Sequence, residues 1–171
     1  MDEKTRFDID KLVSKAIQKI GFKEPPITLD PFLHELEVNR NFVEMEDPSL
    51  IRRFLNKLMI GGEIFTKILK TVKLEGVWFP EEQKILIKTS LPKLKQDWAS
   101  FHEATHRLLP WHRQYFLGDT AQTLDADFLE KLESQANYGA SALMFGGSMF
   151  TKDAIATTPE WQSVELKLDS A

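Results

Sequence analysis

The chain has 171 residues, of which 42% are hydrophobic and 28% are charged, and its formal net charge is -4. This length and composition are typical of one globular domain, and the acidic balance argues against nucleic acid as a direct partner. The chain contains no cysteine, which excludes disulfides, thiolate metal ligands and a cysteine nucleophile from the function classes to consider.

The N-terminal segment is charged throughout and lacks the apolar core of a signal peptide. No apolar run approaches the roughly 18 residues that a membrane span requires. We therefore expect a cytoplasmic protein without a membrane partner. We expect a single domain over residues 1–171, with a polar and weakly patterned tail from about residue 151. The sequence leaves the oligomeric state open.

The first predicted element is an amphipathic helix over residues 8–20, which has apolar residues at helical spacing and ends at Gly21. A short second helix is expected to be capped by Asp30, with Pro31 in its first turn. Weak alternation over residues 39–46 predicts a strand.

The middle of the chain changes from helical to β patterning. Residues 50–59 and 63–72 are each expected to be helical. Residues 73–89 contain two β-rich runs that are joined by the four residues of 80–83. This arrangement predicts a β-hairpin with a four-residue loop.

Another helix is predicted to begin after Ser90, with this hydroxyl as its cap and Pro92 in its first turn, and to end at Pro110. A loop from residue 111 to about 126 then precedes a last helix over residues 127–144. The expected apolar stripe of the first of these helices is Leu94, Trp98, Phe101, Thr105 and Leu108. The inward residues expected on the second are Leu129, Leu132, Ala136, Ala140 and Leu143. The pattern as a whole predicts an α+β fold.

Three of the four histidines lie within residues 102–112, and His102 to His106 has the pattern H-E-x-x-H. Residues at i and i+4 lie one above the other on a helix, so their two imidazoles can converge on one ion. Zinc accepts imidazole nitrogens at about 2.0–2.1 Å, and three protein ligands leave a fourth position for a water of pKa about 7. The intervening Glu103 can take a proton from that water and pass it to a leaving amine.

The same histidines would also suit an ordinary exposed helix face, so a third ligand has to be sought. Glu133 lies 27 positions after His106 (133 − 106) on the last predicted helix. Small residues at Ala136, Gly139 and Ala140 would let that helix approach the H-E-x-x-H helix closely. A carboxylate that points inward there is either paired or metal-bound, and the alternative is a half-exposed glutamate at the helix rim.

The H-E-A-T-H motif, followed by E-S-Q-A-N-Y-G-A-S-A-L-M over residues 133–144, resembles the ImmA/IrrE family of cytosolic zinc metallopeptidases. The family pattern is H-E-x-x-H and then E-x-x-A-N-x-F-A. The paired prolines near residue 25 and the strand before the motif helix also resemble this family, so the likeness covers most of residues 13–150. It implies a zincin-like fold, in which a small twisted antiparallel or mixed sheet packs on a helical bundle. It also implies His102, His106 and Glu133 as zinc ligands and Glu103 as the catalytic base.

Two departures from the family pattern indicate a divergent member. Thr105 stands where the family has glycine, and a buried threonine needs a hydroxyl partner. Gly139 stands where the family has phenylalanine, and glycine costs about 1 kcal/mol of helix stability relative to alanine. Neither departure removes a ligand, so they bear on the substrate rather than on the metal.

Four further residues are candidates for supporting the site. His112 and Asn137 are candidates for holding a ligand from behind, and His112 also for stabilising an oxyanion. Tyr115 and Tyr138 are competing oxyanion donors. A loop histidine such as His112 is otherwise simply a surface residue.

We therefore expect a zinc endopeptidase that acts on a protein or peptide, and the resemblance suggests a transcriptional repressor of the helix-turn-helix type. The hairpin edge near Val77 or Leu86 is expected to pair with an extended substrate. Two alternatives remain: a non-proteolytic zinc-binding interaction module, whose fourth ligand would be His112, and a hydrolase of small amides. Mn²⁺ or Fe²⁺ would fit the same ligands as Zn²⁺.

Overall fold

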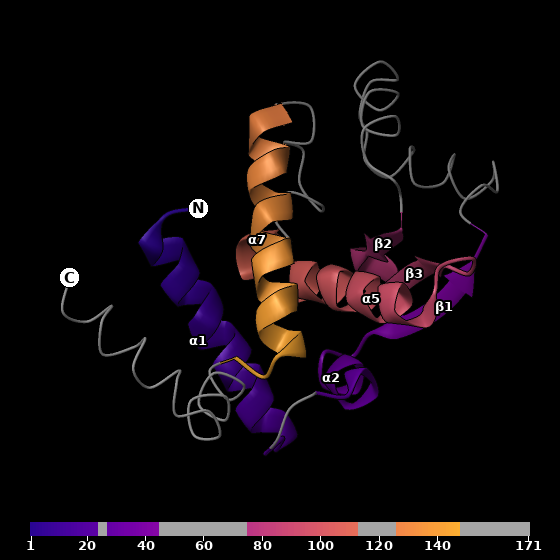
Figure 1. Ribbon diagram of the computed structural model, residues 1–171, viewed down its shortest axis with the longest axis horizontal. Helices are drawn as coiled ribbons and strands as arrows, with labels where there is room; N and C mark the ends of the chain where they lie inside the picture. The colour runs from indigo at the N-terminus through magenta and orange to yellow at the C-terminus, as the bar shows by residue number, and fades with distance from the viewer. Residues whose placement is uncertain (24–26, 45–74, 113–125, 148–171) are drawn as a thin grey trace, which may run out of the picture.

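The computed structural model describes residues 1–23, 27–44, 75–112 and 126–147, and Figure 1 shows their arrangement. The helices expected at residues 50–59 and 63–72, and the tail from residue 151, lie outside these described residues. The fold is α+β, as predicted. Within the described residues, no helix is both long enough and apolar enough to cross a membrane.

Helix α1 (Glu3–Ile20) begins earlier than its apolar pattern predicted. The reason is a local cap, because a carboxylate oxygen of Asp2 accepts a hydrogen bond from the backbone N–H of Thr5 at 2.8 Å. The predicted end at Gly21 is confirmed, and this residue has a φ of 76°, which glycine adopts without strain.

Helix α2 (Leu29–Glu35) follows, and its predicted cap is wrong. The N-cap residue is Thr28, and Asp30 lies in the first turn of the helix. There, Asp30 accepts a hydrogen bond from the guanidinium of Arg40 at 2.9 Å. This pairing with a later strand takes the place of a capping role.

The sheet is small and mixed, as predicted. Its strands are β1 (Asn39–Val43), β2 (Gly76–Phe79) and β3 (Lys84–Lys88), in the order β1-β3-β2. The predicted hairpin is confirmed, since β2 pairs antiparallel with β3 through the turn at residues 80–83. Strand β1 pairs parallel with the other side of β3. Leu86 therefore lies in the central strand, and its prediction as an edge residue is wrong.

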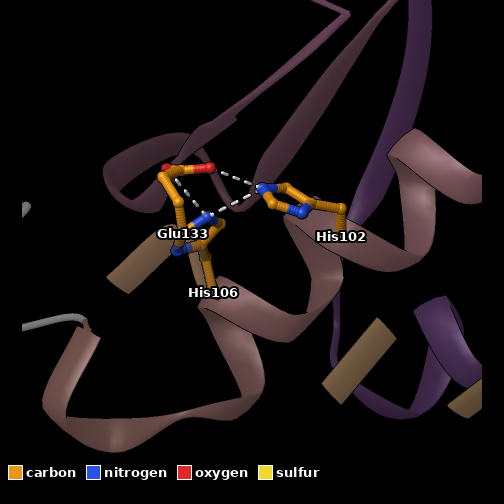
Figure 2. Close-up of side chains that lie close together, drawn as sticks. All are labelled: His102, His106 and Glu133. Carbon is orange, nitrogen blue, oxygen red and sulfur yellow. Dashed lines mark hydrogen bonds and ion pairs between the residues drawn. The ribbon is translucent and has the colours of Figure 1, made fainter. Parts of the chain in front are cut away.

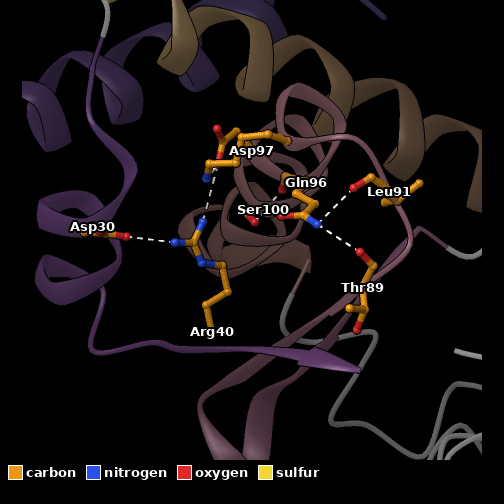
Figure 3. Close-up of polar contacts among 8 residues, drawn as sticks. Asp30, Arg40, Thr89, Leu91, Gln96, Asp97 and Ser100 are labelled. Carbon is orange, nitrogen blue, oxygen red and sulfur yellow. Dashed lines mark hydrogen bonds and ion pairs between the residues drawn. The ribbon is translucent and has the colours of Figure 1, made fainter. Parts of the chain in front are cut away.

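Helix α5 (Lys93–Leu108) begins without the predicted hydroxyl cap of Ser90. The side-chain amide of Gln96 instead donates to the carbonyl oxygens of Thr89 at 3.0 Å and Leu91 at 2.9 Å. Figure 3 shows this arrangement, in which the hydroxyl of Ser100 also donates to the backbone oxygen of Gln96. The side chain of Gln96, in the first turn of α5, thus ties the helix to the segment that follows β3.

A second polar tie joins α5 to the rest of the domain. Arg40 on β1 lies between Asp30 on α2 and Asp97 on α5, with N–O distances of 2.9 and 3.6 Å (Figure 3). The guanidinium also stacks over the ring of Phe42. This largely buried arginine sets the position of α5 relative to the sheet.

The buried face of α5 follows the predicted stripe only in part, because Phe101 and Thr105 are buried whereas Trp98 and Leu108 are partly exposed. Leu94 is 80% exposed, although it lies on the same face as the buried Phe101. Seven residues span about 10 Å of helix, so Leu94 lies near the helix start, beyond the packed part. The residues that α5 buries are Ala99, Ser100, Phe101, Ala104, Thr105 and His106.

Helix α7 (Ala126–Met144) crosses α5 closely (Figure 1). A Cβ atom added at Gly139 would lie 2.5 Å from Cγ2 of Thr105, so only glycine fits there without a shift. The hydroxyl of Thr105 donates to the backbone oxygen of Phe101 at 2.8 Å, which is the partner that a buried threonine needs. The two positions that depart from the ImmA/IrrE pattern, Thr105 and Gly139, thus lie against each other. The side chain of Thr105 on α5 occupies the space that Gly139 on α7 leaves open because it has no side chain.

The remaining expectations for α7 are largely confirmed. Four of its five predicted inward residues, Leu132, Ala136, Ala140 and Leu143, are buried. The helix ends at Gly146 and Gly147, which both have a positive φ. The side chain of Leu129 is outside the described part of the structure.

Candidate metal centre

The predicted metal ligands converge at the crossing of α5 and α7. Figure 2 shows the side chains of His102, His106 and Glu133 pointing toward one another. One potential ligand atom from each lies within 4.8 Å of the other two. The two Nε2 atoms are 3.2 Å apart, and Glu133 approaches His102 Nε2 at 3.1 Å and His106 Nε2 at 3.6 Å.

These distances fit a tetrahedral ion. Two nitrogens bound at about 2.0–2.1 Å with a tetrahedral angle between them are about 3.3 Å apart. The spacing of the two Nε2 atoms is close to that value. Two imidazole nitrogens and one carboxylate form a donor set that suits zinc and also accepts Mn²⁺ or Fe²⁺. The residues present therefore fit a divalent metal ion.

His102 lies at the partly exposed side of the group. Its Nδ1 atom is 3.0 Å from Oδ1 of Asn137, which is one turn after Glu133 on α7. Burial lowers the pKa of His102, but the hydrogen bond to Glu133 and the negative charges of Glu103 and Glu133 outweigh burial and raise this pKa above its usual value. The amide of Asn137 thus holds the ring by the nitrogen that faces away from the other ligands, as the sequence suggested.

His106 is buried, and its surroundings keep it neutral. Burial is the main cause that holds the pKa of His106 well below its usual value, and the nearby His102 and His112 act in the same direction. Its Nδ1 atom lies 2.8 Å from Nδ1 of His112. A neutral imidazole is the form that binds a metal ion.

His112 is neither a surface residue nor part of the ligand group. It lies in a further helical turn that follows α5, and its side chain is fully buried. The predicted loop therefore does not begin at Trp111. Its ring contacts His106 on the side opposite the Nε2 atoms, so His112 supports a ligand from behind and supplies no fourth donor.

Sequence reasoning missed two residues behind the site, Trp111 and Gln135. The indole N–H of Trp111 donates to Oε1 of Gln135 at 2.8 Å, and Nε2 of His112 lies 3.0 Å from the same oxygen. Neither residue belongs to a motif. The one sequence feature that pointed to Gln135 was its position on α7 between Glu133 and Asn137, which were both candidate site residues.

Glu103 lies beside the ligand group but does not belong to it, as its predicted role requires. Burial raises the pKa of Glu103 to about 7; the charge of Glu133 adds to this effect, while the charge of His102 and a hydrogen bond from the backbone N–H of Trp78 oppose it. Strand β2 makes room for this side chain, because a Cβ atom at Gly76 would lie 2.9 Å from Cγ of Glu103.

The backbone group that Glu103 contacts belongs to the outer side of β2. The backbone N–H of Lys88 donates to the oxygen of Glu75, so these two residues form a hydrogen-bonded pair. Hydrogen-bonded and non-bonded pairs alternate along an antiparallel ladder, so Trp78 and its partner Ile85 form a non-bonded pair. The N–H and C=O of Trp78 therefore point away from β3.

The two tyrosine candidates do not join the group. The hydroxyl of Tyr138 donates to the carboxylate of Asp10 on α1, at 2.9 and 3.1 Å from its two oxygens. Tyr138 follows Asn137 directly, so the helix turns it by about 100° away from the ligands, and its proposed oxyanion role is wrong for this arrangement. Tyr115 lies outside the described residues.

The chain matches no family model, and no curated protein sequence matches it significantly. The likeness to the ImmA/IrrE pattern therefore rests only on the sequence features described above. The functional argument depends on the geometry of the site.

Proposed function

We propose that the protein is a zinc-dependent metallopeptidase that cleaves a peptide bond with Glu103 as general base. One observation carries the proposal: two histidine Nε2 atoms and a carboxylate converge from two helices, while a separate carboxylate with a pKa of about 7 lies beside them. Metal ligands and a base of this kind are the two requirements for metal-assisted hydrolysis at neutral pH.

The roles of the residues follow from their positions. His102, His106 and Glu133 hold the metal. When bound, zinc supplies a Lewis acid and lowers the pKa of a coordinated water to about 7. Glu103 takes a proton from the attacking water and returns it to the leaving amine, and a pKa near the working pH suits both steps.

The outer side of β2 supports a peptide as the substrate. Among the described strands, β2 lies at the edge of the sheet, and the N–H and C=O of Trp78 point outward from it. An extended peptide can pair with such an edge by strand addition. A peptide carbonyl would take the N–H that Glu103 occupies, and this exchange would free the carboxylate for proton transfer.

The position of His112 favours the enzyme over a zinc-binding interaction module. In a purely structural site, protein side chains fill all four positions around zinc. Within the described residues, the ligand group comprises His102, His106 and Glu133, and His112 lies behind His106. The three-residue set leaves one position for water. The substrate suggested by the resemblance is a cytoplasmic regulatory protein, such as a helix-turn-helix repressor.

The test compares metal content and cleavage in three proteins: wild type, Glu103→Gln and Glu133→Ala. Metal analysis after zinc repletion measures the first property, and release of new amino termini from a mixture of unstructured peptides measures the second. We expect one zinc per chain in wild type and in Glu103→Gln, cleavage by wild type alone, and loss of both properties in Glu133→Ala.

Each other outcome has a defined meaning. Cleavage by Glu103→Gln at the wild-type rate would refute the base assignment. Stoichiometric zinc without cleavage in wild type would favour the interaction module. No stoichiometric metal in wild type would refute the metal site itself.

A further inference from the structure

The polar residues behind His106, of which Trp111 and Gln135 are partly buried and His112 is fully buried, form a chain that the proposed reaction does not use directly. It runs from Trp111 to Gln135, then to His112 and His106, with successive distances of 2.8, 3.0 and 2.8 Å. Each group in this chain has a limited set of donor and acceptor roles. The position of every proton can therefore be worked out from one end.

The chain begins with a group that has only one role. The indole N–H of Trp111 can donate but cannot accept, so the atom of Gln135 that it contacts must be the carbonyl oxygen. The same Oε1 atom faces Nε2 of His112, and a carbonyl oxygen only accepts. Nε2 of His112 therefore carries a proton.

The next proton follows from the charge state of His112. The ring is fully buried, and its two nitrogens contact the amide oxygen of Gln135 and the ring of His106, neither of which is a carboxylate, so the ring is in its neutral form. A neutral imidazole with a proton on Nε2 has a lone pair on Nδ1. Nδ1 of His106 lies 2.8 Å from that lone pair and must donate to it. His106 then carries its proton on Nδ1, and its Nε2 lone pair is directed at His102 and Glu133.

We infer that Gln135 is a positioning residue that acts through His112 to hold His106 in the tautomer that presents Nε2 to the metal. Which ring nitrogen of a histidine carries the proton is set by the hydrogen bond that the other nitrogen makes. His102 is held directly by the amide of Asn137, whereas His106 is held through two residues. The inference rests on the metal site of the proposed function.

The first test is the tautomer of each histidine in the metal-free protein, measured by long-range ¹H–¹⁵N correlation spectra at pH 8. The chain has four histidines, so the spectrum is simple, and the exposed His34 serves as a reference. We expect His106 to be protonated on Nδ1 and His112 on Nε2. A wild-type His106 that carries its proton on Nε2 would overturn the inference.

The second test uses three variants. Gln135→Leu keeps the approximate size of the side chain but removes the oxygen that sets the direction of the chain. We expect both tautomers of His106 and His112 to be populated, and the zinc affinity in competition with a chelator to fall about 10–100-fold, as is usual when a residue behind a ligand is lost. Gln135→Glu keeps the acceptor and should retain the wild-type tautomers. Ser134→Ala, an exposed neighbour, should change neither property.

Trp111→Phe provides an independent variant if Gln135→Leu fails to fold. It removes the indole donor that orients Gln135, so we expect a partial change of tautomers in the same direction. Wild-type tautomers in folded Gln135→Leu or in Trp111→Phe would refute the role of the chain. Because these spectra need neither metal nor substrate, correct tautomers in a protein that cleaves nothing would refute the peptidase proposal and leave this inference standing.

Discussion

Helix α5 meets its two neighbours in different ways. Against α7, it packs through small side chains, with Thr105 on Gly139, and this close crossing brings the predicted metal ligands together. Against β2, the contact at the site is a single carboxylate, because Glu103 lies over Gly76 and accepts the N–H of Trp78. The ligands are thus positioned by helix packing, and the proposed base is positioned by a strand edge.

This difference implies that the proposed metal binding and the proposed proton transfer depend on separate contacts of one helix. A change on the β2 side should alter catalysis without changing the metal. A change on the α7 side should first alter the stability of the helix crossing. The following predictions test this separation, beginning with the largest expected effect.

Gly76→Ala tests the β2 side. The new methyl group would lie 2.9 Å from Cγ of Glu103, so the carboxylate must move. We expect kcat for peptide cleavage to fall about 10–100-fold, since small displacements of a reacting group have effects of this order. Zinc content should stay at one per chain. Val77→Ala is the matched control, because successive side chains on a strand point to opposite faces. Equal losses of kcat in the two variants would contradict the role of Gly76.

Gly139→Ala tests the α7 side. A Cβ atom at this position would lie 2.5 Å from Cγ2 of Thr105, and overpacking of this kind costs about 2 kcal/mol. We expect this loss in the free energy of unfolding, measured by urea denaturation. In a Thr105→Ser background, the clashing methyl group is absent and the hydroxyl remains, so Gly139→Ala should cost little or even stabilise α7. An equal cost in both backgrounds would show that the two residues are not coupled.

Glu103→Gln tests the electrostatic cost of the buried base in the metal-free protein. The pKa of Glu103 rises from 4.5 to about 7 on folding, so the folded state keeps a proton that the unfolded state loses. Wild type therefore loses stability as the pH rises from about 4.5 to about 7, and glutamine does not share this loss. We expect the stability difference in favour of Glu103→Gln to grow by about 2 kcal/mol between pH 5 and 7.5. A difference that shrinks with rising pH would contradict the raised pKa.

Local patterns predicted the elements that carry the site. The H-E-x-x-H spacing, the two β-rich runs and the glycines after α7 depend on neighbouring residues, and they led to α5, the hairpin and the end of α7. The small residues of α7 predicted a close helix crossing, and the family resemblance implied Glu133 as the third ligand; the structure brings these side chains together.

The errors arose where distant segments decide the outcome. The parallel pairing of β1 with β3 puts Leu86 in the middle of the sheet, and no local pattern of β3 encodes which strands flank it. The ion pair of Asp30 and Arg40 likewise joins two elements, whereas the local pattern around Asp30 favoured a helix cap. Gln135 could not be found from the sequence, because its role depends on the position of His112 after the chain has turned at the end of α5.

The half-exposed position of Glu133 has a consequence for metal exchange. Its side chain is 46% exposed, whereas Ala136, Ala140 and Leu143 of the same helix are fully buried. The carboxylate can therefore swing outward by rotation about its own bonds while the helix stays packed. Such rotations take picoseconds to nanoseconds, far less than the opening of a helix pair. An ion held as proposed would therefore enter or leave the folded domain, with a residence time that depends on the strength of the ligand bonds and not on the rate of unfolding.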